Sequence, residues 1–338
     1  MTQDATTRTA PAAGQVEDDL EQVVRTGGQL AAAMNGVLQG KPEVVRTSII
    51  VLLAEGHLLI EDVPGVGKTM LAKALARSID ASVHRIQFTP DLLPSDITGV
   101  SIFNQDQRRF EFRPGAIFAN VVVGDEINRA SPKAQSALLE SMEERQVTVD
   151  GQTYPLPDPF IIMATQNPVE MEGTYPLPEA QRDRFMARVS VGYPEPASEV
   201  AMLDQHGASS PLEDLQPVTD AARMARVIAA VRRVHAAEAV RQYVVDLATA
   251  TRRHPQIRLG ASPRATLHLL RASRARAALN RRDHVLPDDV QAVAGTVLAH
   301  RLLLTSEAQM ARQSPSTLVS EILQRTRVPG AATPRTAR

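Results

Sequence analysis

The chain has 338 residues, of which 43% are hydrophobic, so it can bury a sizeable core and is long enough for two domains of ordinary size. It contains no cysteine, which excludes disulfides, thiolate metal sites and a cysteine nucleophile. The formal net charge of -1 gives no overall indication of a nucleic-acid or anionic-membrane partner.

The first 15 residues are polar and contain proline, and they lack the basic-then-apolar layout of a signal peptide. We predict a disordered tail here. Two helices follow, over residues 16–40 and 43–55, with Gly40 and Gly56 at their ends. The longest apolar run, SIIVLLAEGHLLI, is too short to cross a bilayer and is broken by Glu55 and Gly56. We therefore expect a soluble cytoplasmic protein without direct membrane insertion.

The hydrophobic period then changes to that of buried strands. HLLIED, VHRIQF, NVVVGDE, FIIMATQN and MARVSVG have strand length, and KTMLAKALARSI between the first two has helical spacing. This alternation predicts an α/β fold with a parallel sheet. Two hairpins interrupt it: VSIFNQDQRRFEF, and QVTVDGQTYPL, which turns at the type I′ pair Asp150 and Gly151.

The chain changes character after residue 195. Residues 196–217 are rich in proline and serine and predict a linker, residues 218–324 are predicted to form helices with no convincing strand, and residues 325–338 a second disordered tail. The α/β domain thus covers residues 16–195. Residues 218–338 hold 20 Arg and Lys against 8 Asp and Glu, while the rest of the chain is acidic. Such a split indicates either faces that meet within or between subunits, or a polyanionic partner.

The segment EDVPGVGKT, between the first strand and its helix, predicts a phosphate-binding loop. Small residues let backbone N–H groups turn toward anionic oxygens, and the helix dipole adds to their field. Lys68 would reach the β and γ phosphates of ATP, and the Thr69 hydroxyl would bind Mg²⁺. The predicted nucleotide-binding residues are Pro64, Gly65, Val66, Gly67, Lys68, Thr69 and Met70. The usual pattern has glycine where this chain has Asp62.

Polar side chains at the ends of two later strands complete a hydrolysis site. Asp125 and Glu126 end NVVVGDE, where Asp125 would hold Mg²⁺ and Glu126 would orient or deprotonate the attacking water. Asn167 ends FIIMATQN, and its amide can accept from water while donating to phosphate. Scattered histidines give no metal pattern, and no GxSxG motif of a serine hydrolase is present.

Two arginines are candidates for stabilising charge on the transferred phosphoryl group. Arg184, in EAQRDRF, is the first choice for an arginine supplied to the next subunit, with Arg182 and Arg129 as rivals. In GASPRATLHLL, Ser262 is a predicted N-cap, which puts Arg264 in the opening turn of a helix. An arginine there opposes the helix dipole, which favours a role elsewhere, such as reaching the bound nucleotide from a lid.

These parts, in this order, resemble the AAA+ ATPases and specifically the MoxR family. The resemblance runs from about residue 20 to 315, and its most specific stretches are RIQFTPDLLPSDITG, DEINRASPKAQSALLESMEERQVTVDG, ATQNPVEMEGTYPLPEAQRDRF and GASPRATLHLLRASRA. It implies a three-layer αβα domain followed by a small all-α lid.

The resemblance also assigns roles to residues. Lys68 and Thr69 match Walker A, Asp125 and Glu126 Walker B, and Asn167 sensor 1. Arg184 matches the arginine finger and Arg264 the sensor 2 arginine, although Arg182 stands where the family pattern has an apolar residue. The two hairpins match insertions expected near the central pore of a ring.

The resemblance implies a hexameric ATPase that remodels or matures protein clients, often proteins with a von Willebrand factor A domain, sometimes by assisting metal or cofactor insertion. Two alternatives stay open. One is a motor acting on nucleic acid, which the basic lid favours, although we find no interleaving of aromatic and basic residues in the hairpins. The other is a nucleotide-gated scaffold with little turnover, against which Glu126 and Asn167 argue.

Overall fold

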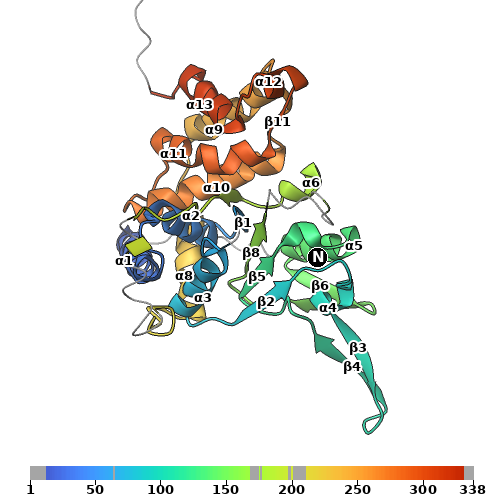
Figure 1. The fold of residues 1–338 in the computed structure, drawn as a ribbon. Coiled ribbons are helices and arrows are strands. Elements are labelled where there is room, and N and C mark those ends of the chain that lie inside the picture. The colour runs from blue at the N-terminus through green and yellow to red at the C-terminus, as the bar shows by residue number, and fades with distance from the viewer. Residues whose placement is uncertain are drawn as a thin grey trace, which may run out of the picture.

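A computed structural model describes residues 13–63, 65–167, 175, 177–196, 199–200 and 211–330. An α/β domain carries a helical lid on one side, and a long hairpin projects from the opposite side (Figure 1). Both predicted tails lie mostly outside the described residues, as does the middle of the predicted linker. Within the described residues, no helix combines the length and apolar character that a membrane span requires.

A five-stranded sheet forms the centre of the α/β domain. Its strand order is β2-β5-β8-β1-β9, and every neighbouring pair is parallel. The strands are β1 (Leu58–Glu61), β2 (Val83–Gln87), β5 (Val121–Asp125), β8 (Ile161–Gln166) and β9 (Ala187–Val189). All five predicted strands are therefore confirmed, together with their parallel direction.

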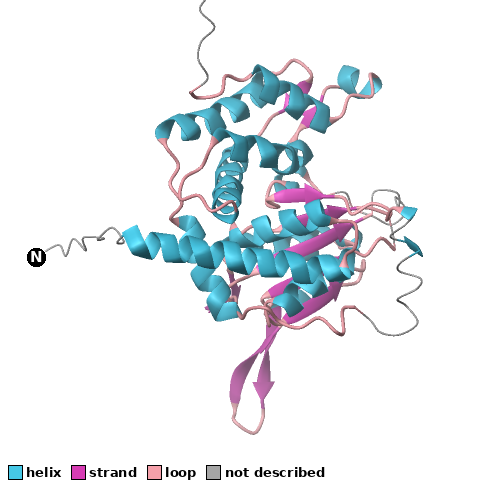
Figure 2. Ribbon diagram, turned by 90° about the vertical axis from the view of Figure 1, so that its left-hand side faces the viewer, coloured by secondary structure: helices cyan, strands magenta, loops and turns pink. Residues whose placement is uncertain are grey.

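Side chains of the central strands are buried on both faces of the sheet. In β5, Val121 and Val123 belong to one core while Val122 belongs to the other. The first core is shared with α1 (Ala13–Val37), α2 (Pro42–Leu53) and α3 (Lys68–Ser78), and the second with α5 (Pro132–Glu144). This arrangement confirms the predicted three-layer αβα architecture, and Figure 2 shows the helices lying across the sheet.

Short elements and two hairpins complete the domain. They are α4 (Pro94–Thr98), η1 (Ile127–Arg129) and α6 (Glu179–Arg182), with the hairpins β3 (Gly99–Asn104) to β4 (Arg109–Pro114) and β6 (Gln146–Val149) to β7 (Gln152–Pro155). Asp150 and Gly151 have φ values of 50° and 78°, both positive as a type I′ turn requires. The β3–β4 hairpin is the one that extends away from the body in both views (Figures 1 and 2).

The lid consists of helices, as predicted, with one correction. The predicted lid region contains α8 (Ala221–Arg232), α9 (Glu238–Arg253), α10 (Pro263–Leu279), α11 (Pro287–Leu298), η2 (Ala299–Arg301), α12 (Ser306–Met310) and α13 (Pro315–Arg325). Of these, α8 packs against α1 of the α/β domain (Figure 1). Two short strands, β10 (Ile257–Leu259) and β11 (Leu303–Leu304), pair antiparallel within it, although the sequence showed no convincing strand there. Segments this short do not establish a two-residue alternation.

The end of α2 differs from its prediction as well. Glu55, not Gly56, adopts the left-handed conformation after the helix, with φ 57°. Gly56 is required for another reason, because a Cβ there would lie 2.5 Å from Cβ of Met186, the residue just before β9. A close approach between two chain segments therefore explains this glycine.

Candidate functional site

The carboxyl ends of β1, β5 and β8 bring the predicted phosphate loop and acidic residues to one edge of the sheet. Because all strands are parallel, the residues that follow them meet at this edge, which is where α/β proteins bind ligands. The loop follows β1, Asp125 ends β5 and Asn167 follows β8, the strand between those two. We call this side of the sheet the carboxyl edge.

The loop itself has the backbone of an anion site. Gly65 and Gly67 have φ values of 84° and 89°, which L side chains rarely adopt, and nothing lies within 4 Å of a Cβ built on either. Backbone conformation, not crowding, therefore requires these glycines. Gly67 is the N-cap of α3, and Lys68, Thr69 and Met70 form its first turn, which contains no acidic residue. Val66 is half-buried, and Pro64 lies outside the described residues.

Asp62, the departure from the usual loop pattern, anchors the loop. Its carboxylate accepts hydrogen bonds from the N–H of Gly192 at 2.6 Å, the hydroxyl of Ser190 at 2.8 Å and the N–H of Val63 at 2.8 Å. Burial opposes the charge on Asp62, but these hydrogen bonds outweigh it and lower its pKa. The Asp62 backbone carbonyl also accepts from Nζ of Lys68 at 2.7 Å.

Asp125 lies beside Thr69, as the predicted metal site requires. The Thr69 hydroxyl is 3.3 Å from each carboxylate oxygen of Asp125, and the Thr165 hydroxyl is 3.3 Å from Oδ1. Asp125 is 5% exposed. Its Oδ2 accepts from Nε of Arg85 at 2.6 Å, a contact that we did not predict. The available signal was the alternation in β2, which places Arg85 and Gln87 on one face of a strand adjacent to β5.

Glu126 has a strained backbone and a defined side-chain position. Its φ of 60° is in the left-handed region, and its N–H donates to the Thr165 hydroxyl at 3.0 Å. Its Oε2 is 3.1 Å from Nε2 of Gln87 and 3.1 Å from Nε of Arg129. Strained non-glycine residues of this kind cluster at functional sites.

Asn167 is buried, with 3% of its surface exposed, directly after β8. Its backbone carbonyl accepts from Nδ2 of Asn128 at 3.4 Å. The strand order places it between the loop after β1 and the acidic pair after β5. No group of three or more His, Asp or Glu side chains suited to holding a metal ion on its own occurs in the described parts of the chain.

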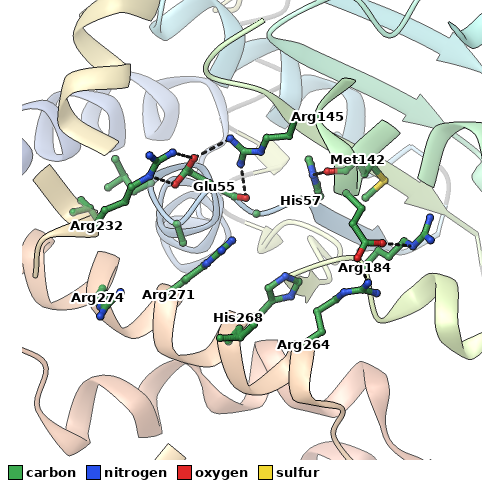
Figure 3. A pocket seen from close by; sticks show the side chains of 16 residues that line it. Glu55, His57, Met142, Arg145, Arg184, Arg232, Arg264, His268, Arg271 and Arg274 are labelled. Atoms are coloured by element: carbon green, nitrogen blue, oxygen red, sulfur yellow. Dashed lines mark hydrogen bonds and ion pairs between the residues drawn. The ribbon is translucent and has the colours of Figure 1, made fainter. Parts of the chain in front are cut away.

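The two predicted phosphoryl-stabilising arginines lie together at the opposite, amino edge of the sheet. Glu143, in the last turn of α5, forms ion pairs with Arg184 at 3.4 Å and with Arg264. Figure 3 shows the two arginines close to each other. Ser262 accepts from the N–H of Ala265 and is the N-cap of α10, as predicted. Arg264 also lies 3.7 Å from Asp183. Of the rivals, Arg129 pairs with Glu126 at the carboxyl edge, while Arg182 is half-buried in α6.

Arg301 joins the lid to the segment that carries Arg184, a contact that sequence reasoning missed. Its side chain is 2% exposed and donates to Asp183 Oδ1 at 2.9 Å and to the carbonyl of Met186 at 3.2 Å. Burial lowers the pKa of Arg301 to about 10, although the Asp183 carboxylate acts in the opposite direction. Ser262 also donates to Asp183, at 2.8 Å. The only sequence signal was a charged residue within the apolar run VLAHRLLL.

Comparisons with known proteins agree with this architecture. Residues 57–187 match the model of the ATPase family associated with various cellular activities (AAA), and residues 249–322 match the AAA lid domain. The chain is 49% identical to the uncharacterised protein YeaC of Bacillus subtilis over 93% of this chain and 97% of that protein. It is 43% identical to Chaperone MoxR1 of Mycobacterium tuberculosis over 87% of this chain and 80% of the relative.

A solved structure matches over almost the whole chain. It is a crystal structure of a protein from Cytophaga hutchinsonii proposed to be an ATPase, with a TM-score of 0.86 and 37% sequence identity. The match covers 93% of this chain and 98% of the other.

Proposed function

Because the chain belongs to the MoxR family of AAA+ ATPases, we propose that it binds ATP and Mg²⁺ at the carboxyl edge and hydrolyses ATP to remodel a protein partner. The observation that carries this proposal is the convergence of the loop and the acidic pair, with the Thr69 hydroxyl 3.3 Å from both oxygens of Asp125. The positions of the loop, the acidic pair and Asn167 at one edge of the sheet support the roles that we propose for them.

The residues at this edge fit Mg²⁺. This ion prefers oxygen ligands and uses few of them from the protein, with waters and substrate phosphates supplying the rest. The adjacent Thr69 hydroxyl and Asp125 carboxylate are such a pair. The Arg85 guanidinium contacts Oδ2 of Asp125, so a metal ion bound there would share this carboxylate with Arg85 or displace it. Bound there, Mg²⁺ would neutralise charge on the phosphates.

The protein groups then divide the work of hydrolysis. The N–H groups of the loop and the Lys68 ammonium would hold the phosphates. Glu126 would accept a proton from the attacking water, and Asn167 would orient that water toward the γ-phosphate. The Glu126 N–H donates to the Thr165 hydroxyl and the Gln87 amide donates to the Glu126 carboxylate, and the two hydrogen bonds restrict where that base can point.

Arg184 and Arg264 are proposed to act on the ATP of a neighbouring subunit. The strands of the sheet have three to six residues and rise ~3.3 Å per residue, so the two edges are separated by roughly 10–20 Å. That distance is far beyond hydrogen-bonding reach of a nucleotide held by the chain's own loop. A head-to-tail interface that brings one subunit's amino edge to the next subunit's carboxyl edge closes into a ring, which supports the proposed hexamer.

The client of the proposed motor is a protein. The relative named Chaperone MoxR1 supports a chaperone role, and we extend this to maturation of partners with a von Willebrand factor A domain, with metal or cofactor insertion as one coupled event. The projecting β3–β4 hairpin offers a contact surface, because Phe103 and Phe110 are 49% and 72% exposed and stack edge to face at 5.3 Å. Exposed apolar patches of this kind are typical of protein-binding sites.

The proposal is tested by ATP turnover and nucleotide binding in two variants. Glu126→Gln is expected to keep ATP affinity and to lose 10²-fold or more in turnover, on the scale of general-base catalysis. Turnover equal to that of the wild type would instead support the nucleotide-gated scaffold. Arg184→Ala is expected to be inactive alone and to regain activity when mixed with Glu126→Gln, because the mixed interface restores one complete site. Absence of rescue would contradict action between subunits.

A nucleic-acid client is a second candidate, and one observation favours it. Residues 218–338 hold 20 Arg and Lys against 8 Asp and Glu, a charge that suits a polyanion, whereas on the β3–β4 hairpin the exposed Phe103 and Phe110 lie on one face and Arg109 on the other. Exposed aromatic side chains are the groups on which the bases of a single strand stack, and Phe110 is one such side chain. Fluorescence anisotropy of labelled single-stranded DNA distinguishes the clients, because salt-dependent binding lost in Phe110→Ala would support nucleic acid.

A further inference from the structure

A basic cavity lies between the α/β domain and the lid, at the amino edge of the sheet. Its volume is about 700 Å³, within the range of small-molecule sites. It is formed by the end of α2 and the residues after it, the end of α5, α8 and one face of α10. Six arginines line it (Figure 3): Arg145, Arg184, Arg232, Arg264, Arg271 and Arg274.

The carboxylates in the cavity wall do not balance these cations. Glu55 and Glu143 are the acidic residues that line it. Glu55 pairs with Arg145 at 2.8 Å and with Arg232, and Glu143 pairs with Arg184 and Arg264. Six guanidinium groups therefore face two carboxylates.

Glu55 and Glu143 pair with the other four arginines of the cavity, so Arg271 and Arg274 have no carboxylate partner among the lining residues. Neither forms an ion pair with any carboxylate in the described parts of the chain, and Nε of Arg274 is shielded from solvent without a hydrogen-bond partner. A buried polar group without a partner costs free energy, so this part of the wall is incomplete as it stands.

The uncompensated charge affects neighbouring groups. Burial and then the nearby Arg301 and Arg271 lower the pKa of His268 to about 2, which keeps its imidazole neutral. Burial and the charges of Arg271 and Arg241 lower the pKa of Arg274. In both cases burial is the largest cause, and neighbouring guanidinium charges act in the same direction.

Helix α10 holds the cations in a fixed arrangement. Arg264, His268, Arg271 and Arg274 follow one another at spacings of three or four residues, so they share one face of the helix. Ala272 and Ala275 on the same helix are buried, which fixes the helix against the rest of the lid. A preorganised row of guanidinium forks suits phosphate oxygens better than a row of ammonium groups would.

We propose that this cavity is a second anion site, separate from the phosphate loop, which binds a small oligophosphate, either inorganic or attached to a nucleoside. A triphosphate carries several negative charges and has equatorial oxygens that accept from guanidinium groups in pairs, which matches the excess of cations over carboxylates. The site lies across the sheet from Lys68. Of its arginines, Arg184 and Arg264 are those proposed to serve a neighbour's ATP, whereas Arg271 and Arg274 are not, and the second site therefore rests on these two. Occupancy would join the end of α5 to α10 and so fix the lid.

The test measures tripolyphosphate binding by calorimetry in full-length Lys68→Ala protein, whose phosphate loop is disabled. Adding Arg271→Gln and Arg274→Gln is expected to weaken binding at least tenfold. The matched control adds Arg253→Gln and Arg258→Gln, which remove two exposed lid arginines outside the cavity, and is expected to bind as tightly as its parent. Equal affinity in all three proteins, or equal weakening by both pairs, would overturn the proposal.

Thermal unfolding of the same proteins provides a second readout that does not depend on ATP hydrolysis. Tripolyphosphate is expected to raise the Tm of the control and not that of the cavity variant. Because Arg271 and Arg274 form no ion pair in the described residues, replacing them breaks none, and the two proteins should be equally folded without ligand. A comparison with ATP in the Lys68→Ala background identifies the source, since tighter binding of ATP indicates a nucleotide and weaker binding an inorganic oligophosphate. A cavity filled by an acidic segment of a neighbouring subunit would bind neither probe, which would overturn the proposal.

Discussion

Replacing Asp62 by glycine, the residue that phosphate loops usually have at this position, is expected to destabilise the fold. The substitution leaves the Gly192 N–H and the Ser190 hydroxyl without their acceptor, at 2.6 and 2.8 Å. Hydrogen bonds to a charged group contribute about 1.5–3 kcal/mol each, so the two together amount to about 3 kcal/mol at the lower limit. We use that limit because Gly192 is half-buried and water can partly replace the carboxylate. At about 2–4 °C per kcal/mol, Tm falls by roughly 6–12 °C.

The assay is thermal or urea unfolding across pH, together with ATP binding. Because the pKa of Asp62 is lower in the folded protein, its stabilisation is present above the unfolded pKa of about 3.9 and is lost as pH falls through the folded value. The difference in stability between wild type and Asp62→Gly should therefore be largest near neutral pH. Asp106→Gly, at the exposed tip of the β3–β4 hairpin, is the matched control. An unchanged Tm for Asp62→Gly would refute the reasoning, whereas retained ATP affinity is expected because the loop pattern tolerates glycine.

Further predictions concern the loop, the domain junction and the buried histidine. Lys68→Ala is expected to lose ATP binding by calorimetry, because the ammonium that faces the phosphates is gone; unaltered affinity would contradict the loop assignment. Arg301→Met should cost about 3–5 kcal/mol in urea unfolding, since it leaves Asp183 without its buried partner. Burial lowers the pKa of His57 to about 4, so its contribution to stability is complete above about pH 6.5 and declines toward pH 4. In His57→Gln, the unfolding free energy should depend less on pH within that window. A pH dependence equal to that of the wild type would contradict the assigned contribution of His57.

The central sheet could be predicted from the sequence because its strands are buried on both faces. Runs such as VVVGD are almost wholly apolar, so they are easy to identify as buried strands, and their carboxyl ends carry the polar residues. Parallel strands share a carboxyl edge, so the meeting of Thr69 with Asp125 followed once the fold class was known. The insertion of β8 between β5 and β1 could not be predicted, since strand order depends on tertiary packing.

Contacts made over long sequence separations are what the sequence could not predict. Arg85 reaches Asp125 only because β2 lies beside β5, and Arg301 reaches Asp183 only because the lid packs on the segment before β9. The role of Asp62 depends likewise on Ser190 and Gly192, which lie far along the chain. Periodicity shows that Arg85 and Gln87 share one face of their strand, but neither propensity nor periodicity shows which strand lies beside it. The predicted domain boundaries and the roles of the individual site residues stay predictions for the experiments above.

The placement of loop and arginines on opposite edges of the sheet has a consequence for how activity should depend on assembly. If Arg184 and Arg264 act on a neighbour's ATP as proposed, each subunit contributes a phosphate loop to one site and two arginines to another. A single subunit then contains no complete site. An open row of subunits would contain one complete site fewer than its number of chains, and closing the row would supply the missing one. Specific activity should then rise with protein concentration and increase once more when the ring closes. The last subunit to join would supply its arginines to a nucleotide that is bound by the loop of its neighbour.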